Sequence, residues 1–330
     1  MPVPIVTIFG GSGFIGRYVA QRMARAGWRV RVAVRRPNEA HFVRPYGVVG
    51  QVEPIQANIR DEASTRRVIR GADAVVNCVG VLAEKGKQTF DALLDEGAAR
   101  IARIAAEEGV GRLVHISAIG ADPATDSQYA AAKGRGEAAV RAAFPGAVIL
   151  RPSVVFGVED GFFNKFAAMA RISPVLPLVG PDTRFQPVYV ADVAAAAAAA
   201  ATGTAAPGVY ELGGPEVATF RELMQRMLKI IHRRRLIVAL PFGLARMMAG
   251  FLDFLPRVTC GLFTNSVVTR DQVRQLARDN VAAPEMPGLP ELGIRPTAMD
   301  AVLESYLYAY RPHGQYDAMT ASAGNLRPRT

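Results

Sequence analysis

A glycine-rich loop directly after the first apolar run constrains the fold of this chain more than any other feature. The run Val3–Phe9 reads as a buried strand, and a helical pattern begins as soon as the loop ends. The glycines match the spacing GxGxxG when read from Gly11 and GxxGxxG when read from Gly10. Because such a turn lacks Cβ atoms, its N–H groups and the N-terminus of the next helix can approach a pyrophosphate. We therefore predict a dinucleotide site formed by Gly10, Gly11, Ser12, Gly13, Phe14, Ile15 and Gly16.

Alternating strand and helix patterns extend this start into an α/β domain. Five more β-branched runs are separated by helical stretches, namely Arg29–Val34, Val52–Gln56, Ala74–Cys78, Leu113–Ile116 and Ala147–Leu150. This rhythm predicts a Rossmann-type, doubly wound parallel sheet, to which Val209–Leu212 is expected to return. We expect a Rossmann core over 1–150, interleaved core elements and cleft residues over 151–220, a smaller, mostly helical, basic and apolar C-terminal lobe over 221–310, and a polar tail over 311–330.

The excess of positive charge is concentrated in one part of the chain. The net charge is +10, and residues 221–280 carry eleven basic side chains against four acidic ones. Within this stretch, residues 229–256 join a basic cluster to an apolar segment, which favours contact with a membrane surface or another protein. No uncharged apolar run of about 18 residues occurs, so no membrane-spanning helix is expected. A nucleic-acid partner is not expected, because no DNA-binding motif accompanies the charge.

The cysteines and histidines indicate neither a disulfide framework nor a metal site. Cys78 and Cys260 are far apart, neither belongs to a CxxC motif, and the four histidines have no neighbours at ligand spacing. The early strand Val3–Phe9 leaves no room for a signal or transit peptide. We therefore expect a chain that is made in the cytosol or has already been processed, in a reducing compartment.

Residues after the later strands specify the nucleotide further. The second strand ends in Arg35 and Arg36, where proteins specific for NAD(H) usually carry an acidic residue. Arginine suits a 2′-phosphate, so NADP(H) is favoured over NAD(H). Other strand ends are expected to contribute Asn58, Ile59, Asn77, Val79, Gly80, Arg151, Pro152 and Ser153. The last three would close the site over the nicotinamide, and an ordinary strand-end turn explains them equally well.

Ser117, Tyr129 and Lys133 form a candidate catalytic trio. Ser117 follows a predicted strand, and Tyr129 and Lys133 lie one turn apart on one face of the next helix. In carbonyl reduction a tyrosine hydroxyl donates its proton to the developing alkoxide, a nearby ammonium lowers the tyrosine pKa, and a serine hydroxyl orients the carbonyl. Tyr129 and Lys133 could instead hold the cofactor's ribose without turnover. Both interpretations stay open.

Together these motifs resemble the short-chain dehydrogenase superfamily, in its atypical or extended branch, over nearly the whole chain. Later motifs such as Gln186–Val190 and Thr269–Asp271 look like those of the dehydrogenase-like, NADPH-binding accessory subunits of respiratory complex I (NADH:ubiquinone oxidoreductase). The resemblance implies a tightly held NADP(H) outside the electron-transfer chain and other complex I subunits as partners. It also implies a role in assembly and stability near the quinone site and the membrane-arm junction. The implied location is peripheral, on the cytoplasmic face of a bacterial inner membrane or the matrix face of a mitochondrial one.

Two function classes therefore compete. The leading hypothesis is a non-catalytic NADP(H)-binding subunit of complex I. The alternative is a free-standing NADP(H)-dependent reductase or epimerase that acts on a sugar nucleotide or a quinone, motivated by Ser117, Tyr129 and Lys133. A nucleic-acid-binding regulator is a weaker third hypothesis, because the basic stretch has apolar surroundings.

Overall fold

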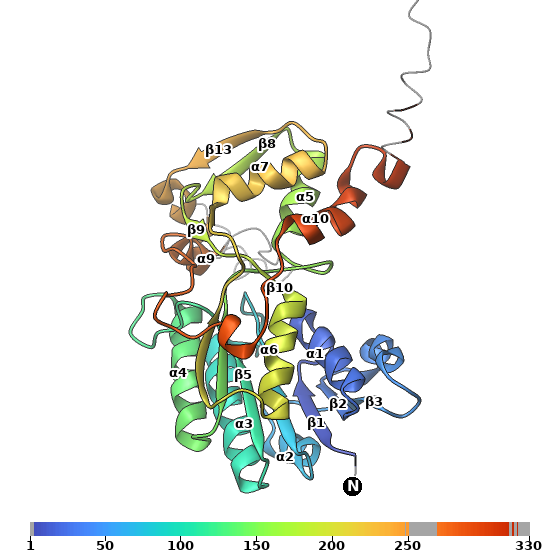
Figure 1. Ribbon diagram of the computed structural model, residues 1–330. Coiled ribbons are helices and arrows are strands. Elements are labelled where there is room, and N and C mark those ends of the chain that lie inside the picture. Colours follow the sequence, from blue (N-terminus) through green and yellow to red (C-terminus); the bar gives the residue numbers. More distant parts are fainter. Residues whose placement is uncertain (1–2, 248, 251–268, 317–318, 320–321, 323–330) are drawn as a thin grey trace, which may run out of the picture. The chain divides into compact units, whose positions relative to one another are not determined.

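The computed structural model of the protein describes residues 3–247, 249–250, 269–316, 319 and 322 (Figure 1). They fall into two compact units whose segments alternate along the sequence. Unit 1 comprises Met1–Ser153, Val190–Gly213 and Ala282–Pro296, and unit 2 comprises Val154–Tyr189, Gly214–Val281 and Thr297–Thr330. Residues 248 and 251–256 of the predicted basic and apolar segment, Cys260 and most of the predicted tail lie outside the described residues.

A seven-stranded parallel sheet forms the centre of unit 1, in the order β11-β6-β5-β4-β1-β2-β3. Its strands are β1 Ile5–Phe9, β2 Arg29–Val34, β3 Val52–Gln56, β4 Ala74–Asn77, β5 Arg112–Ile116, β6 Val148–Pro152 and β11 Gly208–Leu212. The order runs one way from β1 through β2 to β3 and the other way from β4 to β6, so the switch point lies between β1 and β4. This arrangement confirms the predicted Rossmann-type sheet, including the return of residues 208–212 beside β6.

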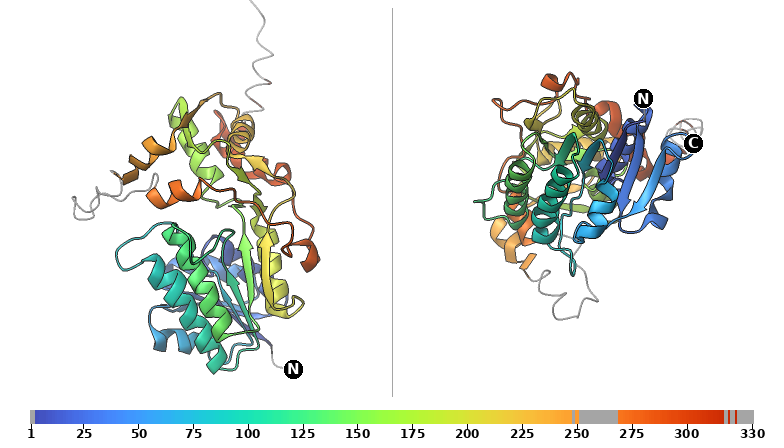
Figure 2. Two further views of the ribbon diagram at one scale, coloured as in Figure 1. Left: turned by 90° about the vertical axis from the view of Figure 1, so that its left-hand side faces the viewer. Right: turned by 90° about the horizontal axis from the view of Figure 1, so that it is seen from below.

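Helices cover both faces of this sheet (Figures 1 and 2). The helices α2 Glu62–Ile69, α3 Glu96–Glu107 and α4 Gln128–Ala143 share one apolar core with β1, β4 and β5. On the other face, α1 Phe14–Arg25 packs against α6 Val190–Thr202. The helix α6 buries most of its alanines, because methyl groups let a helix lie close to its neighbours. A 3-10 helix, η1 Pro37–Tyr46, follows β2, and a short π-helix, η2 Asp91–Asp95, leads into α3.

Unit 2 combines helices with short strand pairs around an aromatic core. The parallel pair is β8 Val175–Val179 with β13 Leu236–Leu240. The shorter pairs are β7 Val155–Phe156 with β10 Val188–Tyr189, and β9 Arg184–Phe185 with β12 Ala218–Thr219. The helices are α5 Phe163–Ile172, α7 Phe220–Ile230, α9 Arg270–Gln275 and α10 Asp300–Leu307. Short 3-10 turns are η3 Pro290–Leu292 in unit 1, and η4 Tyr308–Tyr310 and η5 Gly314–Tyr316 in unit 2.

The basic stretch after residue 220 is divided between a helix and a strand. Thr219 and Glu222 form the capping box that begins α7. The helix ends at Ile230, and His232 takes a left-handed φ of 53°. The chain then turns, and Leu236–Leu240 pairs with β8. In the part of the chain that the structure describes, no helix has the length and apolar character to cross a bilayer.

Candidate functional site

The glycine loop forms a tight turn between β1 and α1. Gly10 has a φ of +70°, its N–H donates to the carbonyl of Ala33, and its carbonyl accepts from Gly13 at 2.9 Å. A Cβ on Gly16 would lie 2.2 Å from the carbonyl oxygen of Gly10, so this position requires glycine. No side chain caps α1 at Gly13. The first-turn N–H groups of α1 therefore present a cradle that suits a pyrophosphate.

The end of β2 carries the predicted arginines at the surface. Arg35 and Arg36 are both exposed. Arg36 pairs with Glu39 at 2.9 Å, whereas Arg35 makes no ion pair among the residues that the structure describes. No acidic residue occupies the end of this strand, so the electrostatic field there favours an added negative charge.

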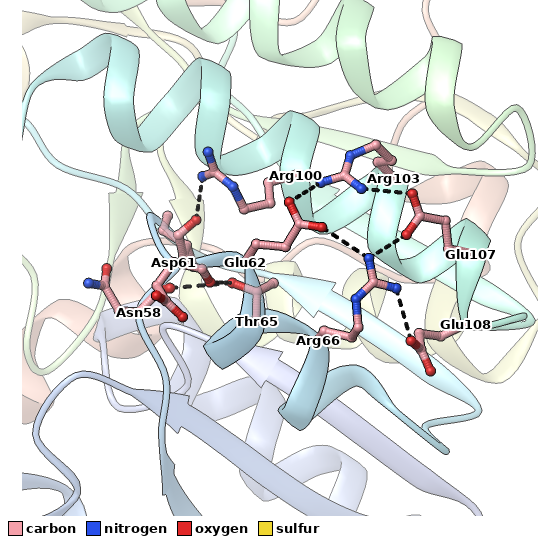
Figure 3. A network of polar contacts seen from close by, with 10 residues as sticks. Asn58, Asp61, Glu62, Thr65, Arg66, Arg100, Arg103, Glu107 and Glu108 are labelled. Atoms are coloured by element: carbon pink, nitrogen blue, oxygen red, sulfur yellow. Dashed lines mark hydrogen bonds and ion pairs between the residues drawn. The ribbon is translucent and has the colours of Figure 1, made fainter.

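The turn after β3 is held by α2 and α3 (Figure 3). The N–H of Asn58 donates to Ser64 Oγ at 3.0 Å, and the guanidinium of Arg100 donates to the carbonyl of Ile59 at 2.7 Å. The Ile59 side chain is buried against Gly97, where an added Cβ would lie 2.6 Å from Ile59 Cδ1. The Ile59 side chain is therefore largely shielded from a nucleotide, and the predicted contact of Ile59 with the cofactor stays a prediction. Ion pairs among Glu62, Arg66, Arg103, Glu107 and Glu108 join α2 to α3.

The end of β4 lies beside the glycine loop. Asn77 is buried, its Oδ1 accepts from the N–H of Val79 at 3.1 Å, and its amide nitrogen donates to His115 Nδ1 at 3.1 Å. Burial, and secondarily the ammonium of Lys133, lowers the pKa of His115 to about 3, so its imidazole is neutral. Asn77 therefore shapes the turn through its own amide, while Gly80 beyond it is exposed with open space around it.

The structure brings Ser117 and Lys133 together at the end of β5. Lys133 is buried, and its Nζ donates to the carbonyl of Ile116 at 2.8 Å. Ser117 is also buried, and its Oγ has no hydrogen-bond partner in the described structure. Burial lowers the pKa of Lys133 to about 8, while the negative charge of Glu137 acts in the opposite direction. A hydroxyl without a partner and a buried amine are the groups that a ribose or a carbonyl oxygen would satisfy.

Tyr129 lies in the first turn of the same helix, one turn before Lys133, with Ser127 as the N-cap. Its ring is half-buried and meets Phe90 edge to face, with 5.7 Å between the ring centroids. The two side chains at positions i and i+4 project from one face of α4. The joint role of Ser117, Tyr129 and Lys133 stays a prediction.

Arg151 is engaged within unit 1. Its guanidinium donates to both carboxylate oxygens of Glu137, at 2.6 Å from Nη2, and lies 3.4 Å from Glu211. These bonds join β6 to α4 and β11. Pro152 and Ser153 continue the strand, and the N–H of Ser153 donates to the carbonyl of Leu212. Any contact of Arg151 with a nicotinamide would compete with two buried carboxylates.

The sequence alone assigned no role to three residues at or near this site, namely Arg17, His115 and Glu137. Glu137 follows Lys133 at helical spacing, which was a usable signal, and Arg17 follows the last loop glycine directly. His115 was noticed without a role, because its partner Asn77 comes from another strand. Among the described residues, no three His, Cys, Asp or Glu side chains gather as a metal site would require.

Comparison with known proteins places these features in a family. The model of the NAD dependent epimerase/dehydratase family matches residues 6–213. Among solved structures, the UDP-glucose 4-epimerase of Thermus thermophilus in complex with NAD is 18% identical, with a TM-score of 0.67 over 93% of this chain and 99% of that chain. The dTDP-glucose 4,6-dehydratase DesIV of Streptomyces venezuelae is 21% identical, with a TM-score of 0.67 over 96% of this chain and 99% of that chain. At these identities the likeness concerns the fold.

Three curated relatives are more similar in sequence. The mitochondrial NADH dehydrogenase (ubiquinone) 1 alpha subcomplex subunit 9 of Arabidopsis thaliana is 34% identical over 96% of this chain and 81% of its own length. The mitochondrial 40 kDa subunit of NADH-ubiquinone oxidoreductase from Neurospora crassa is 31% identical over 97% of this chain and 83% of its own length. A ceramide reductase of Caulobacter vibrioides is 34% identical over 58% of this chain and 59% of its own length.

Proposed function

The chain belongs to the NAD dependent epimerase/dehydratase family, and on this premise we propose that it is an NADP(H)-binding accessory subunit of respiratory complex I. The observation that carries the proposal is its similarity to two subunits of that enzyme over 96% and 97% of the chain. In this proposal the subunit contributes to assembly and stability near the quinone site, where the peripheral arm joins the membrane arm. It lies on the cytoplasmic face of a bacterial inner membrane or the matrix face of a mitochondrial one.

NADP(H) is the proposed cofactor. The glycine loop would hold the pyrophosphate, and Arg35 and Arg36 would attract a 2′-phosphate. Ser117 Oγ, buried without a partner among the described residues, and Lys133 Nζ would hydrogen-bond hydroxyls of the nicotinamide ribose. When bound, the nicotinamide supplies hydride transfer. In the subunit the same contacts would retain the nucleotide without turnover.

A basic apolar stretch in unit 2 supports the proposed place beside a membrane. It is made of exposed residues at the end of α5 and in or just before β13, namely Arg171, Ile172, Arg234, Leu236 and Val238. Ile172 is 89% exposed and Leu236 65% exposed, although both are apolar. The N–H of Leu236 donates to the carbonyl of Pro174, so the end of α5 and the start of β13 are adjacent. Apolar side chains next to arginines suit the interface of an anionic bilayer.

Purification of the native assembly in mild detergent tests the proposal. The chain should be recovered in a complex I particle, and nucleotide released from that particle should amount to about one NADP(H) per chain. Deletion of the gene should lower the yield of the assembled particle. A particle that contains all its other subunits but lacks this chain would contradict the subunit proposal.

A free-standing reductase or epimerase is the second candidate, because Ser117, Tyr129 and Lys133 are intact and the ceramide reductase is a partial relative. This candidate predicts turnover of NADPH with a ketone-bearing substrate by the purified chain. Tyr129→Phe should then abolish turnover with little change in the nucleotide Kd. Recovery of the chain only outside complex I would favour this candidate over the first.

A further inference from the structure

Arg17 is placed at the glycine loop by two hydrogen bonds and one contact with an aromatic ring. It lies in the first turn of α1, directly after Gly16. Its Nη2 donates to the carbonyl of Ser12 at 3.2 Å and its Nε to the carbonyl of Gly13 at 3.3 Å. The guanidinium carbon also lies 4.9 Å from the centre of the Phe42 ring. The charged group is therefore held at one place rather than moving freely in solvent.

That place borders the end of β2. The N–H of Gly10 donates to the carbonyl of Ala33, and a Cβ on Gly11 would lie 3.0 Å from Val32 Cγ1, so the loop packs on the last residues of β2. Phe42 belongs to η1, which begins directly after Arg36. By contacting both the loop and η1, Arg17 spans the two segments that flank the strand end.

In a Rossmann fold the ribose 2′ position of a dinucleotide lies at the end of β2. We propose that Arg17 is a specificity-determining residue that, together with Arg35 and Arg36, selects a nucleotide with a 2′-phosphate. This inference rests on the proposed binding of NADP(H). Two carbonyl acceptors and an aromatic ring orient the guanidinium before the ligand arrives, which reduces the entropy lost on binding. Glu39 partly neutralises Arg36, so a further cation adds to the attraction.

A purely structural role for Arg17 makes a different prediction. If the side chain only stiffened the loop, its removal would weaken NADPH and NADH equally, because both carry the same pyrophosphate. If it reads the 2′-phosphate, only nucleotides with that group lose affinity. The ratio of the two dissociation constants separates the two roles.

The experiment is calorimetric titration of the purified full-length chain with NADPH, NADH, adenosine 2′,5′-bisphosphate and 5′-AMP. Arg17→Ala should raise the Kd for NADPH and for the bisphosphate by about tenfold to a hundredfold, and change the other two by less than about twofold. The Kd of Arg17→Lys for NADPH should lie between those of the wild type and Arg17→Ala, because an ammonium keeps the charge but lacks the planar guanidinium. Arg22→Ala is the matched control, since Arg22 is exposed on the same helix. Apo-protein Tm reports whether any variant disturbs folding.

The outcomes distinguish this inference from the cofactor proposal. A wild-type preference for NADPH that Arg17→Ala and Arg17→Lys leave unchanged overturns the role of Arg17 and leaves the cofactor proposal standing. Equal losses of affinity for NADPH and NADH in Arg17→Ala also overturn the specificity role of Arg17 and favour loop stiffening. A wild-type chain that binds NADPH and NADH equally overturns both the role of Arg17 and the cofactor proposal. A loss of affinity for NADPH and adenosine 2′,5′-bisphosphate alone supports both.

Discussion

Replacing Arg151 by methionine tests how the candidate site is held in place. The variant keeps the aliphatic stem and removes the guanidinium that joins β6 to α4 and β11. Glu137 lies one turn beyond Lys133 on α4, so this ion pair fixes the helix that carries Tyr129 and Lys133. The Glu137 side chain is only 1% exposed, that of Glu211 is 9% exposed, and that of Arg151 is 20% exposed.

The magnitude follows from burial. Removing one partner of a buried pair leaves an uncompensated buried charge, which costs about 3–5 kcal/mol. In a domain of the size of unit 1, each kcal/mol lowers Tm by about 2–4 °C, so the expected fall is about 6–20 °C. Hydrogen bonding to Glu137 raises the pKa of Arg151, which agrees with a pair that is stabilised in the folded state. Glu137→Gln should relieve part of the loss in the double variant, with a coupling energy of about 0.5–3 kcal/mol.

Urea unfolding followed by circular dichroism measures the free energy of unfolding and the coupling energy, and thermal melting followed by the same signal measures Tm. Arg103→Met is the matched control, because Arg103 also contacts two carboxylates but lies on the surface, where the side chains of Arg103, Glu62 and Glu107 are 44%, 51% and 40% exposed (Figure 3). Solvent screens such pairs, so this control should leave the midpoint nearly unchanged. Equal effects of Arg151→Met and Arg103→Met would refute the reasoning, since burial would then not decide the contribution of the pair.

Three further predictions follow from other parts of the chain. Gly16→Ala places a methyl group 2.2 Å from a carbonyl oxygen of the loop. Calorimetry should therefore show loss of nucleotide binding, and melting should show a loss of stability of about 1–3 kcal/mol. In the control Gly111→Ala the nearest contact of the new methyl group is 3.5 Å, so nucleotide binding and stability should stay near wild type. The pKa of Lys133 is about 8 in the folded chain against an ordinary 10.5, so the unfolded chain keeps this proton to higher pH. The free energy of unfolding, measured relative to Lys133→Met, should therefore rise by about 3 kcal/mol from pH 8 to 10.5. A difference between the two proteins that does not change with pH in urea titrations would contradict this. Leu236→Glu should weaken sedimentation with vesicles that contain anionic lipid, whereas Val49→Glu in unit 1, also at an exposed apolar position, should not; equal binding by the two variants would argue against the basic apolar stretch as the lipid contact.

Local patterns were sufficient to predict the sheet and the loop. The strand, the closely spaced glycines and the following helix are adjacent in sequence, and the steric demand on Gly16 arises within seven residues. The capping box of Thr219 and Glu222 is equally local. Tyr129 and Lys133 share a helix, so their common face also followed from spacing alone.

Contacts between distant residues were decided by the tertiary structure. Arg151 meets Glu211 across 60 positions, and this pairing depends on β11 returning beside β6 in one particular register. The burial of Ile59 depends on Gly97, which allows α3 to approach the turn after β3. The pairing of β13 with β8 likewise joins segments that are far apart in sequence. Composition and spacing determine which elements form, whereas side-chain partners depend on which elements become neighbours, because hydrogen bonds and ion pairs act over a few ångströms in space and not along the chain.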